Sequence, residues 1–182
     1  AEIKTPPTYA ASEIYSADSV LIGKYFKENR IPVKYNEVTP TFWNALISTE
    51  DERFYSHHGV DFMGIGGAVK DALTRDGARG ASTITQQLAK NMFHIRNKEY
   101  SGVLGKIPGL RMLIAKAKEW IIAYKIEFIY SKNEILTMYA NTVDFGNNAY
   151  GIKTAARTYF NTTPQHLTTE QSATLVGMLK AT

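Results

Sequence analysis

The sequence contains no cysteine among its 182 residues. Disulfide bonds, thiolate metal sites and a cysteine nucleophile are therefore excluded. Long apolar runs are missing as well. Charged residues interrupt each run well before the ~18–20 residues that a membrane-spanning helix needs, so we expect no such span in this sequence. The first eleven residues contain neither a basic leader nor a hydrophobic core. We therefore expect either a soluble protein or one from which a targeting segment has been removed.

The composition is that of a folded globular protein, with 44% hydrophobic and 21% charged residues. The length suits one compact domain that buries most of its apolar surface. The net charge of +4 is unevenly distributed, because residues 90–132 contain nine basic and only three acidic residues. Such a segment favours an anionic partner, namely nucleic acid, phosphate or an acidic membrane surface. A solvated helix face would explain the same pattern equally well.

The first 35 residues read as extended, and residues 14–23 resemble a short β-hairpin with a polar break at residues 16–19. Helical periodicity dominates afterwards. Two early helices are indicated by apolar residues on one face: Phe42, Ala45, Leu46 and Thr49 after Pro40, and Phe62, Ile65, Val69 and Leu73 after Asp61. Three later helix starts have the spacing of a capping box: Thr83 with Gln86, Ser131 with Glu134, and Thr168 with Gln171.

The longest helix is expected over residues 111–130. Its apolar stripe consists of Leu110, Leu113, Ile114, Ala117, Ile121, Tyr124 and Phe128. Lys116 and Glu119 lie three residues apart and away from this stripe, where an ordinary surface ion pair would explain them. Residues 94–108 lack a clean period and contain two glycines and a proline, so we expect a mobile loop there. The pattern as a whole predicts a mainly helical protein with a small β element at its front.

Two further clusters could carry chemistry. The acidic run at residues 50–52 follows directly after a predicted helix, although helix C-termini favour cations. Catalysis, a structural hydrogen bond or a solvated turn would each explain it. His57 and His58 follow, but adjacent histidines rarely bind one ion, and packing or hydrogen bonding is the simpler role. Residues 80–87 are small and hydroxyl-bearing at a helix start, which is typical of an anion site, and they lack the ending of a Walker loop.

Taken together, the clusters form signatures in a fixed order. The first three are Glu50-Asp51-x-x-Phe54-x-x-His57-x-Gly59, Gly80-x-Ser82-Thr83-Ile84-Thr85-Gln86-Gln87 and Lys116-x-x-Glu119. A fourth contains Ile135-Leu136-x-x-Tyr139-x-Asn141, and a fifth contains Leu167-x-x-Glu170. With these signatures, residues 12–182 resemble the family 51 peptidoglycan glycosyltransferases, found in class A penicillin-binding proteins and monofunctional glycosyltransferases. Ala115 departs from the family pattern, which has arginine there, and puts one pyrophosphate contact in doubt.

The resemblance implies polymerisation of lipid II into β-1,4-linked glycan strands, with inversion and release of undecaprenyl diphosphate. Glu50 would be the general base, and Glu119 a second catalytic carboxylate on the donor side. The substrate-binding residues it implies are Asp51, Phe54, His57, Gly80, Ser82, Thr83, Gln86, Gln87, Lys90, Lys116 and Asn141. It allows a divalent cation, Mg²⁺ or Mn²⁺, near Glu119 and implies no organic cofactor.

The resemblance also implies a lysozyme-like helical large lobe with a smaller membrane-facing lobe. Residues 1–35 would then form an N-terminal linker with the hairpin, and residues 36–182 the glycosyltransferase domain, with the small lobe at about 94–113. Apolar residues alternate with cations there, as suits insertion at the headgroup level: Val103, Leu104, Lys106, Ile107, Leu110, Arg111, Met112 and Leu113. The expected location is the outer face of the bacterial cytoplasmic membrane, with an anchoring helix preceding this sequence.

The implied partners are lipid II, the growing glycan chain and the membrane surface, with moenomycin as an inhibitor and no nucleic acid. Two other classes of function stay open. A lysozyme-like glycan hydrolase would also use an acidic residue in a helical cleft. A non-catalytic glycan-binding module would tolerate the loss of Glu50.

Overall fold

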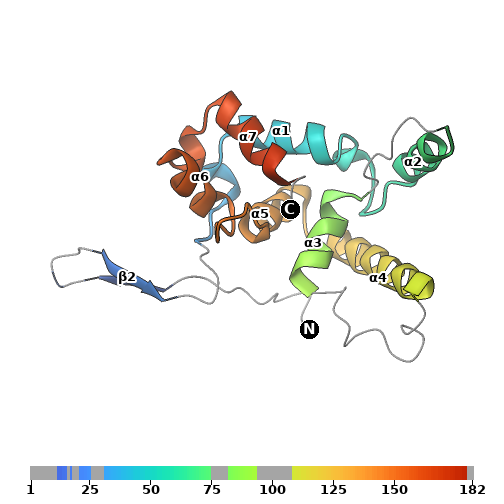
Figure 1. Cartoon of the computed structure of the whole chain (residues 1–182), viewed down its shortest axis with the longest axis horizontal. Coiled ribbons are helices and arrows are strands. Elements are labelled where there is room, and N and C mark those ends of the chain that lie inside the picture. Colours follow the sequence, from blue (N-terminus) through green and yellow to red (C-terminus); the bar gives the residue numbers. More distant parts are fainter. Residues whose placement is uncertain are drawn as a thin grey trace. The chain divides into compact units, whose positions relative to one another are not determined.

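The computed structural model describes residues 12–15, 17, 21–25, 31–74, 82–93 and 108–179. This part of the chain contains seven α-helices and one two-stranded sheet, which confirms the predicted mainly helical fold (Figure 1). The chain divides into two compact units, residues 47–135 and residues 4–46 with 136–182, and we describe each by itself. The predicted domain boundary at residue 35 stays a prediction. Most of the predicted small lobe at residues 94–113, including Leu104 and Ile107, lies outside the described residues.

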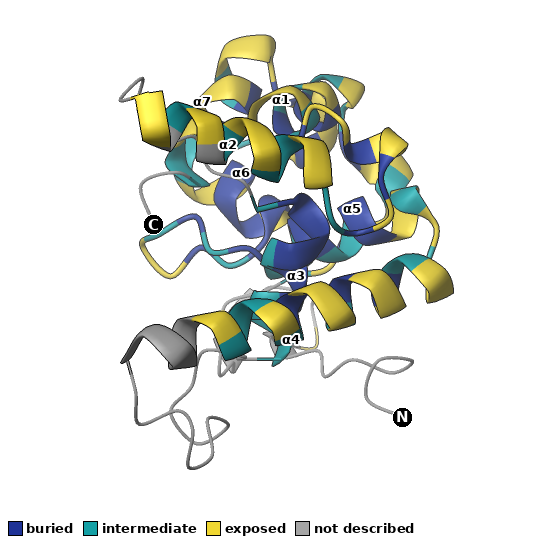
Figure 2. Ribbon diagram, turned by 90° about the vertical axis from the view of Figure 1, so that its right-hand side faces the viewer, coloured by how far each residue is buried: buried dark blue, intermediate teal, exposed yellow. Residues whose placement is uncertain are grey.

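The first unit contains the helices that carry most of the predicted site. Helix α1 (Pro40–Glu50) enters it at Ile47, followed by a 3-10 turn (Phe54–Ser56) and α2 (Phe62–Thr74). Helices α3 (Ile84–Phe93) and α4 (Pro108–Ile129) come next, and α5 (Lys132–Thr142) begins here. Helix α3 packs against α4 (Figures 1 and 2). The buried apolar residues of this unit are Phe54, Ile84, Leu88, Ala89, Ala123, Ile126 and Ile135.

The second unit contains the hairpin and the C-terminal helices. Strands β1 (Ser12–Tyr15) and β2 (Leu21–Tyr25) pair antiparallel, as predicted. A 3-10 turn (Tyr35–Glu37), α6 (Ile152–Phe160), another 3-10 turn (Pro164–His166) and α7 (Thr169–Leu179) belong here with parts of α1 and α5. The largest fully buried side chains of this unit are Tyr139, Phe42, Phe145, Leu46, Leu136, Ile152 and Leu175.

The side-chain hydrogen bonds that cap the helices agree with the predicted helix starts. The amide of Ser131 donates to Glu134 Oε2 at 2.7 Å, and the amide of Glu134 donates weakly back to Ser131 Oγ at 3.4 Å. Thr168 and Gln171 make the same reciprocal pair at the start of α7. At α2, Asp61 is the N-cap, because its Oδ1 accepts the amide of Gly64 at 2.9 Å. Both complete capping boxes therefore confirm the sequence prediction.

The sequence predicted that the apolar stripe of α4 packs inward and that Lys116 and Glu119 lie outside. In the structure the stripe faces solvent instead. Leu113, Ile121, Tyr124 and Phe128 have exposed fractions of 68%, 56%, 60% and 86%, and α4 is largely exposed in Figure 2. The side of α4 that packs inward contains Glu119, Ala123 and Ile126, all nearly inaccessible. Glu119 is therefore part of a buried ion pair and not of a surface one. The apolar residues do recur along one side of α4, as the periodicity indicated. The helix α3 packs against a different side, which ion-paired carboxylates occupy.

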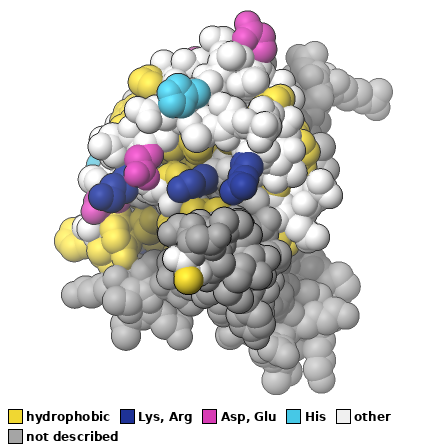
Figure 3. Space-filling model, turned by 90° about the vertical axis from the view of Figure 1, so that its left-hand side faces the viewer, with side chains coloured by type: hydrophobic (Ala, Val, Ile, Leu, Met, Phe, Trp, Pro, Cys, Tyr) yellow, Lys and Arg dark blue, Asp and Glu magenta, His cyan; other side chains and the backbone are white. Residues whose placement is uncertain are grey.

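The exposed surface differs between faces. On the face of Figure 3, acidic and basic side chains of the described residues lie scattered among neutral surface, and neither sign forms a broad patch. None of the described helices is both long enough and apolar enough to cross a membrane. The exposed apolar side chains belong mainly to α2 and α4 and include Phe62, Met63, Leu73, Leu113, Trp120, Ile121, Tyr124 and Phe128.

Candidate active site

Glu50 is the last residue of α1, and its carboxylate is held on one side only. Gln87 of α3 donates from Nε2 to Glu50 Oε2 at 2.9 Å. The other oxygen, Oε1, is buried and has no hydrogen-bond partner among the described residues. Gln87 thus sets the direction of the carboxylate, and one of its oxygens keeps its acceptor capacity unused among the described residues, as a general base requires. This arrangement fits the general base that the signature predicted at this position.

Asp51 and His57 form a buried pair directly after α1. His57 Nε2 lies 2.9 Å from Asp51 Oδ1 and 3.0 Å from Oδ2. The amide of Gly59 donates to His57 Nδ1 at 3.2 Å, which leaves Nε2 as the nitrogen that faces the Asp51 carboxylate. Asp51 Oδ2 also accepts the amide of Ile84 at 3.0 Å, at the start of α3. Asp51 therefore joins the segment after α1 to the positive end of α3.

Gly59 brings this segment against α3 and α4. Thr83 Oγ1 donates to the Gly59 carbonyl at 2.7 Å, and Gln86 Nε2 donates to the same oxygen at 3.2 Å. The predicted capping box of α3 is thus half formed: the Gln86 amide donates to Thr83 Oγ1 at 3.1 Å, whereas the Gln86 side chain turns to Gly59. Gly59 has φ +85°, and a Cβ there would lie 2.7 Å from the backbone carbon of Ala123. Only glycine fits this approach.

Lys116 and Glu119 lie on the inner side of α4. Lys116 Nζ lies 2.8 Å from Glu119 Oε2 and donates to Ser82 Oγ at 2.8 Å. The Glu119 side chain is 2% exposed, but that of Lys116 is 32% exposed. The ammonium is therefore held by a buried carboxylate and a hydroxyl, while about a third of the lysine side chain stays accessible. Such a fixed cation is suited to stabilise negative charge on a bound group.

Three polar residues that the sequence analysis did not select as site residues form a buried network in this unit. Thr85 Oγ1 donates to Glu127 Oε1 at 2.6 Å. Lys132 Nζ pairs with Glu127 Oε2 at 2.7 Å, donates to the His57 carbonyl at 2.8 Å, and lies 4.3 Å from the centre of the Phe54 ring. Thr85 belongs to the second signature, but Glu127 and Lys132 counted only toward the local charge. No periodic pattern could have paired them, since their contacts join three separate segments.

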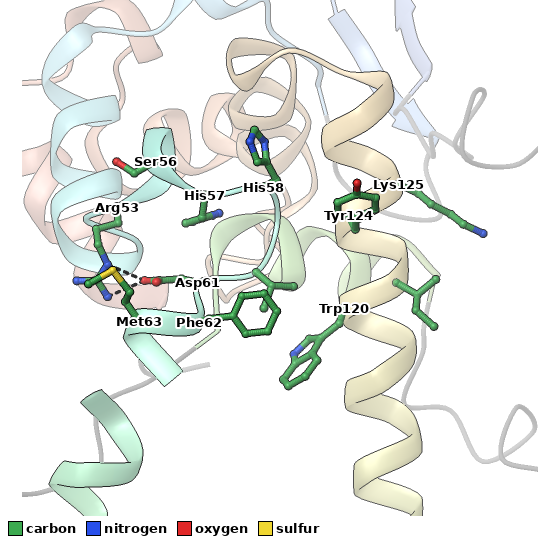
Figure 4. A pocket seen from close by; sticks show the side chains of 12 residues that line it. Arg53, Ser56, His57, His58, Asp61, Phe62, Met63, Trp120, Tyr124 and Lys125 are labelled. Carbon is green, nitrogen blue, oxygen red and sulfur yellow. Dashed lines mark hydrogen bonds and ion pairs between the residues drawn. The ribbon is translucent and has the colours of Figure 1, made fainter. Parts of the chain in front are cut away.

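An apolar pocket of about 660 Å³ opens between the start of α2 and the middle of α4 (Figure 4). It is lined by Arg53, Ser56, His57, His58, Val60, Asp61, Phe62, Met63, Trp120, Ile121, Tyr124 and Lys125. At one edge Arg53 Nη2 lies 2.6 Å from Asp61 Oδ2. Burial acts to raise the pKa of Asp61, but hydrogen bonds from Arg53 and Gly64 and the Arg53 charge outweigh it, so the pKa lies below its ordinary value.

The comparisons with known proteins agree with this geometry. The family described as "Transglycosylase" matches residues 18–182. The chain belongs to this transglycosylase family. Penicillin-binding protein 1A of Escherichia coli strain K12 is 42% identical over 170 residues, which cover 93% of this chain and 18% of that protein. Penicillin-binding protein 1F of Bacillus subtilis is 39% identical over 174 residues, which cover 95% of this chain and 22% of that protein. The chain thus spans about a fifth of the length of these relatives.

The transglycosylase residues that the signatures selected are distributed over both units. Glu50, Asp51, Phe54, His57, Ser82, Thr83, Gln86, Gln87, Lys90, Lys116 and Glu119 belong to the first unit. Lys90 is half-buried in the last turn of α3. Asn141 belongs to the second unit, where it accepts the Val33 amide and donates to the Val33 carbonyl, each at 2.9 Å. Gly80 lies outside the described residues. Their substrate-binding roles stay predictions.

The described part of the transglycosylase contains no group of three or more histidine, aspartate or glutamate residues that could hold a metal ion. Glu119 could take part only in a different kind of metal site, in which the substrate supplies further ligands. Mg²⁺ is often held by one or two carboxylates together with substrate phosphate oxygens. In this chain Glu119 already pairs with Lys116, so a cation there would have to share the carboxylate with the ammonium.

Proposed function

We propose that this chain is a peptidoglycan glycosyltransferase that polymerises lipid II into β-1,4-linked glycan strands and releases undecaprenyl diphosphate. The observation that carries the proposal is the carboxylate of Glu50, with Oε2 held by Gln87 and Oε1 buried without a hydrogen-bond partner in the described structure. Family membership and the similarity to penicillin-binding proteins 1A and 1F support it.

The reaction needs a base on one side and positive charge on the other. The 4-hydroxyl of the acceptor lipid II would lose its proton to Glu50 as its oxygen forms the bond to the donor's anomeric carbon. The bond from that carbon to the diphosphate breaks, and the configuration inverts. Lys116 would stabilise the charge that develops on the departing diphosphate, with Glu119 and Ser82 holding the ammonium in place.

The two ends of this chemistry are joined by the start of α3. Ser82 precedes the helix and binds Lys116, and Gln87 within the helix binds Glu50. A hydrolase would need no cation for a lipid diphosphate, so the Lys116–Ser82 contact favours the transferase. A divalent cation shared between Glu119 and the diphosphate would add to the same stabilisation, and no step above depends on it.

The decisive assay supplies purified lipid II and measures glycan polymer with and without moenomycin. We expect polymer that moenomycin suppresses. Glu50→Gln should lower the rate of polymer formation by ~10²–10⁴-fold. Release of soluble fragments from polymeric peptidoglycan without polymer formation would instead identify a hydrolase. If Glu50→Gln were as active as the wild type, Glu50 would not be the general base.

The partner surface proposed for the membrane is the exposed apolar side of α2 and α4. Phe62, Met63 and Phe128 have exposed fractions of 71%, 79% and 86%, and Lys125 of α4 is exposed and belongs to the lining of the same pocket as Phe62 and Met63. Apolar side chains next to a cation suit the interface of an anionic bilayer. On this proposal the transglycosylase would lie at the outer face of the cytoplasmic membrane, where its lipid-linked substrate would be available.

The membrane proposal is tested with anionic phospholipid vesicles. Met63→Ser and Phe128→Ser together should weaken vesicle binding and leave the melting temperature unchanged, because both side chains are exposed in the folded protein. Tyr55→Ser, which removes an exposed aromatic residue outside α2 and α4, is the control. Unchanged binding by the double variant would remove these helices from the membrane surface.

A further inference from the structure

Glu127 is a buried carboxylate that the proposed mechanism does not use. It lies on α4, its side chain is 3% exposed, and it accepts a hydrogen bond from Thr85 at 2.6 Å. Lys132 pairs with it at 2.7 Å. A buried ion pair of this kind is weak evidence for a role in stability, since apolar residues of similar volume often stabilise a fold as well or better. The role of this pair must therefore be sought in the groups that it holds in place.

The network holds the two segments that meet at the Glu50 carboxylate. Thr85 lies on α3, two residues before Gln87, whose amide binds Glu50. Lys132 reaches the carbonyl of His57, in the segment that follows Glu50 directly. Glu127 thus bonds to α3 directly and to the segment after α1 through Lys132.

The direction of the Gln87 amide depends on how α3 is rotated about its axis. Asp51 at the Ile84 amide and Thr83 at Gly59 fix the first residues of the helix. The Thr85 hydroxyl is the next bond along α3, and the carboxylate that accepts it also pairs with the lysine. Loss of this bond would remove one of the side-chain contacts that fix α3 beside Gln87 and leave the Gln86 contact with Gly59. A misplacement of ~1 Å near a reacting group can cost ~10²-fold in rate.

We infer that Glu127, with Thr85 and Lys132, is a positioning residue for glycosyl transfer that acts through Gln87 on the orientation of Glu50. The inference rests on the proposed function. It assigns Glu127 no contact with substrate. We expect its effect mainly on kcat, because it acts on the direction of the Glu50 carboxylate through Gln87.

The test uses Thr85→Val, which keeps the shape of the side chain and removes the hydroxyl, and Thr85→Ser, which restores it. With lipid II as substrate, Thr85→Val should lower kcat about 10-fold, well within the ~10²-fold cost of misplacement, and leave KM within about 2-fold. Thr85→Ser should return kcat to within about 3-fold of wild type. Thr154→Val is the matched control, because the Thr154 hydroxyl is buried in the other unit without a hydrogen-bond partner in the described structure.

A second comparison separates positioning from a merely structural role. In a Gln87→Ala background the amide that Thr85 positions is gone, so Thr85→Val should then change kcat by less than about 2-fold, because coupled residues are non-additive. Equal losses in both backgrounds, or no loss in the wild-type background, would overturn the inference. Glu127→Gln should resemble Thr85→Val if it folds. An inactive wild-type chain would overturn the proposed function and this inference with it, whereas an active wild type with an unaffected Thr85→Val overturns the inference alone.

Discussion

Lys116→Ala separates the catalytic from the structural role of the ion pair on α4. Lys116 Nζ lies 2.8 Å from the carboxylate of Glu119, whose side chain is only 2% exposed, but a third of the lysine is accessible. A fully buried pair that loses one partner costs ~3–5 kcal/mol, and exposed pairs contribute ~0–1 kcal/mol. The partial exposure of Lys116 places the expected cost between them, at ~1–2 kcal/mol. At ~2–4 °C per kcal/mol for a protein of this size, the melting temperature should fall by ~2–8 °C.

The same substitution should have a much larger effect on turnover. Removing a fixed group that stabilises transition-state charge typically costs ~10²–10³-fold in kcat. We expect Lys116→Ala to lose at least ~10²-fold, and Lys116→Arg to recover only part of it, because a planar guanidinium cannot occupy the same point between Ser82 and Glu119. A residue outside the site, the exposed Lys153 of α6, provides the control Lys153→Ala.

The assay measures lipid II polymerisation at a temperature where circular dichroism shows both proteins fully folded, so that the rate refers to folded enzyme. A rate loss in Lys116→Ala that is no larger than the loss of folded protein would refute the reasoning. The pair would then be a structural feature of α4 alone.

Three further predictions concern the same unit. Glu50→Gln should keep the wild-type melting temperature and lower turnover by ~10²–10⁴-fold, and a near-normal rate would remove it as the base. Gly59→Ala should destabilise the fold by ~3 kcal/mol or more in denaturant unfolding, because φ +85° strains a side chain and its Cβ would meet the backbone of Ala123 at 2.7 Å. An alanine variant of wild-type stability would contradict this contact. Asp61→Asn keeps the helix cap but loses the charge that Arg53 binds. Since the pKa of Asp61 is lowered in the folded state, its contribution is present above ~pH 4 and disappears as pH falls through the folded-state pKa, so wild type and variant should differ in stability at pH 7 and converge in acid. A difference that persists at low pH would show that the charge is not its source.

Local signals in the sequence predicted the elements well. Pro40 begins α1, the pattern after Asp61 corresponds to α2, and the boxes at Ser131 and Thr168 form at the starts of α5 and α7. These features depend on residues a few positions apart, whose geometry is set by the helix itself. The hairpin was found for the same reason, since its two paired strands lie close together in the sequence.

The orientation of α4 could not be predicted in this way. Its apolar residues recur at helical spacing, which normally marks the packing side. The inner side contains Glu119 and Glu127 instead, and their burial is possible only because Lys116, Lys132 and Thr85 come to them from other turns and segments. Lys116 and Lys132 are close to their carboxylates in sequence, but Thr85 is 42 residues from Glu127, and no local pattern shows which side of α4 faces α3. The signatures did select Glu50 and Gln87, but only the structure shows that the one binds the other.

The acidic inner side of α4 sets stability and activity against each other. At positions such as Glu119 and Glu127, apolar residues of similar volume are often neutral or stabilising in other proteins, provided that the whole ion pair is replaced together. A selection for heat resistance alone would therefore be expected to accept leucine or methionine at these positions along with changes at Lys116 and Lys132. If the proposed function holds, the survivors would be robust helical proteins with impaired glycan polymerisation. Stabilised variants of this chain are best chosen by melting temperature and turnover together.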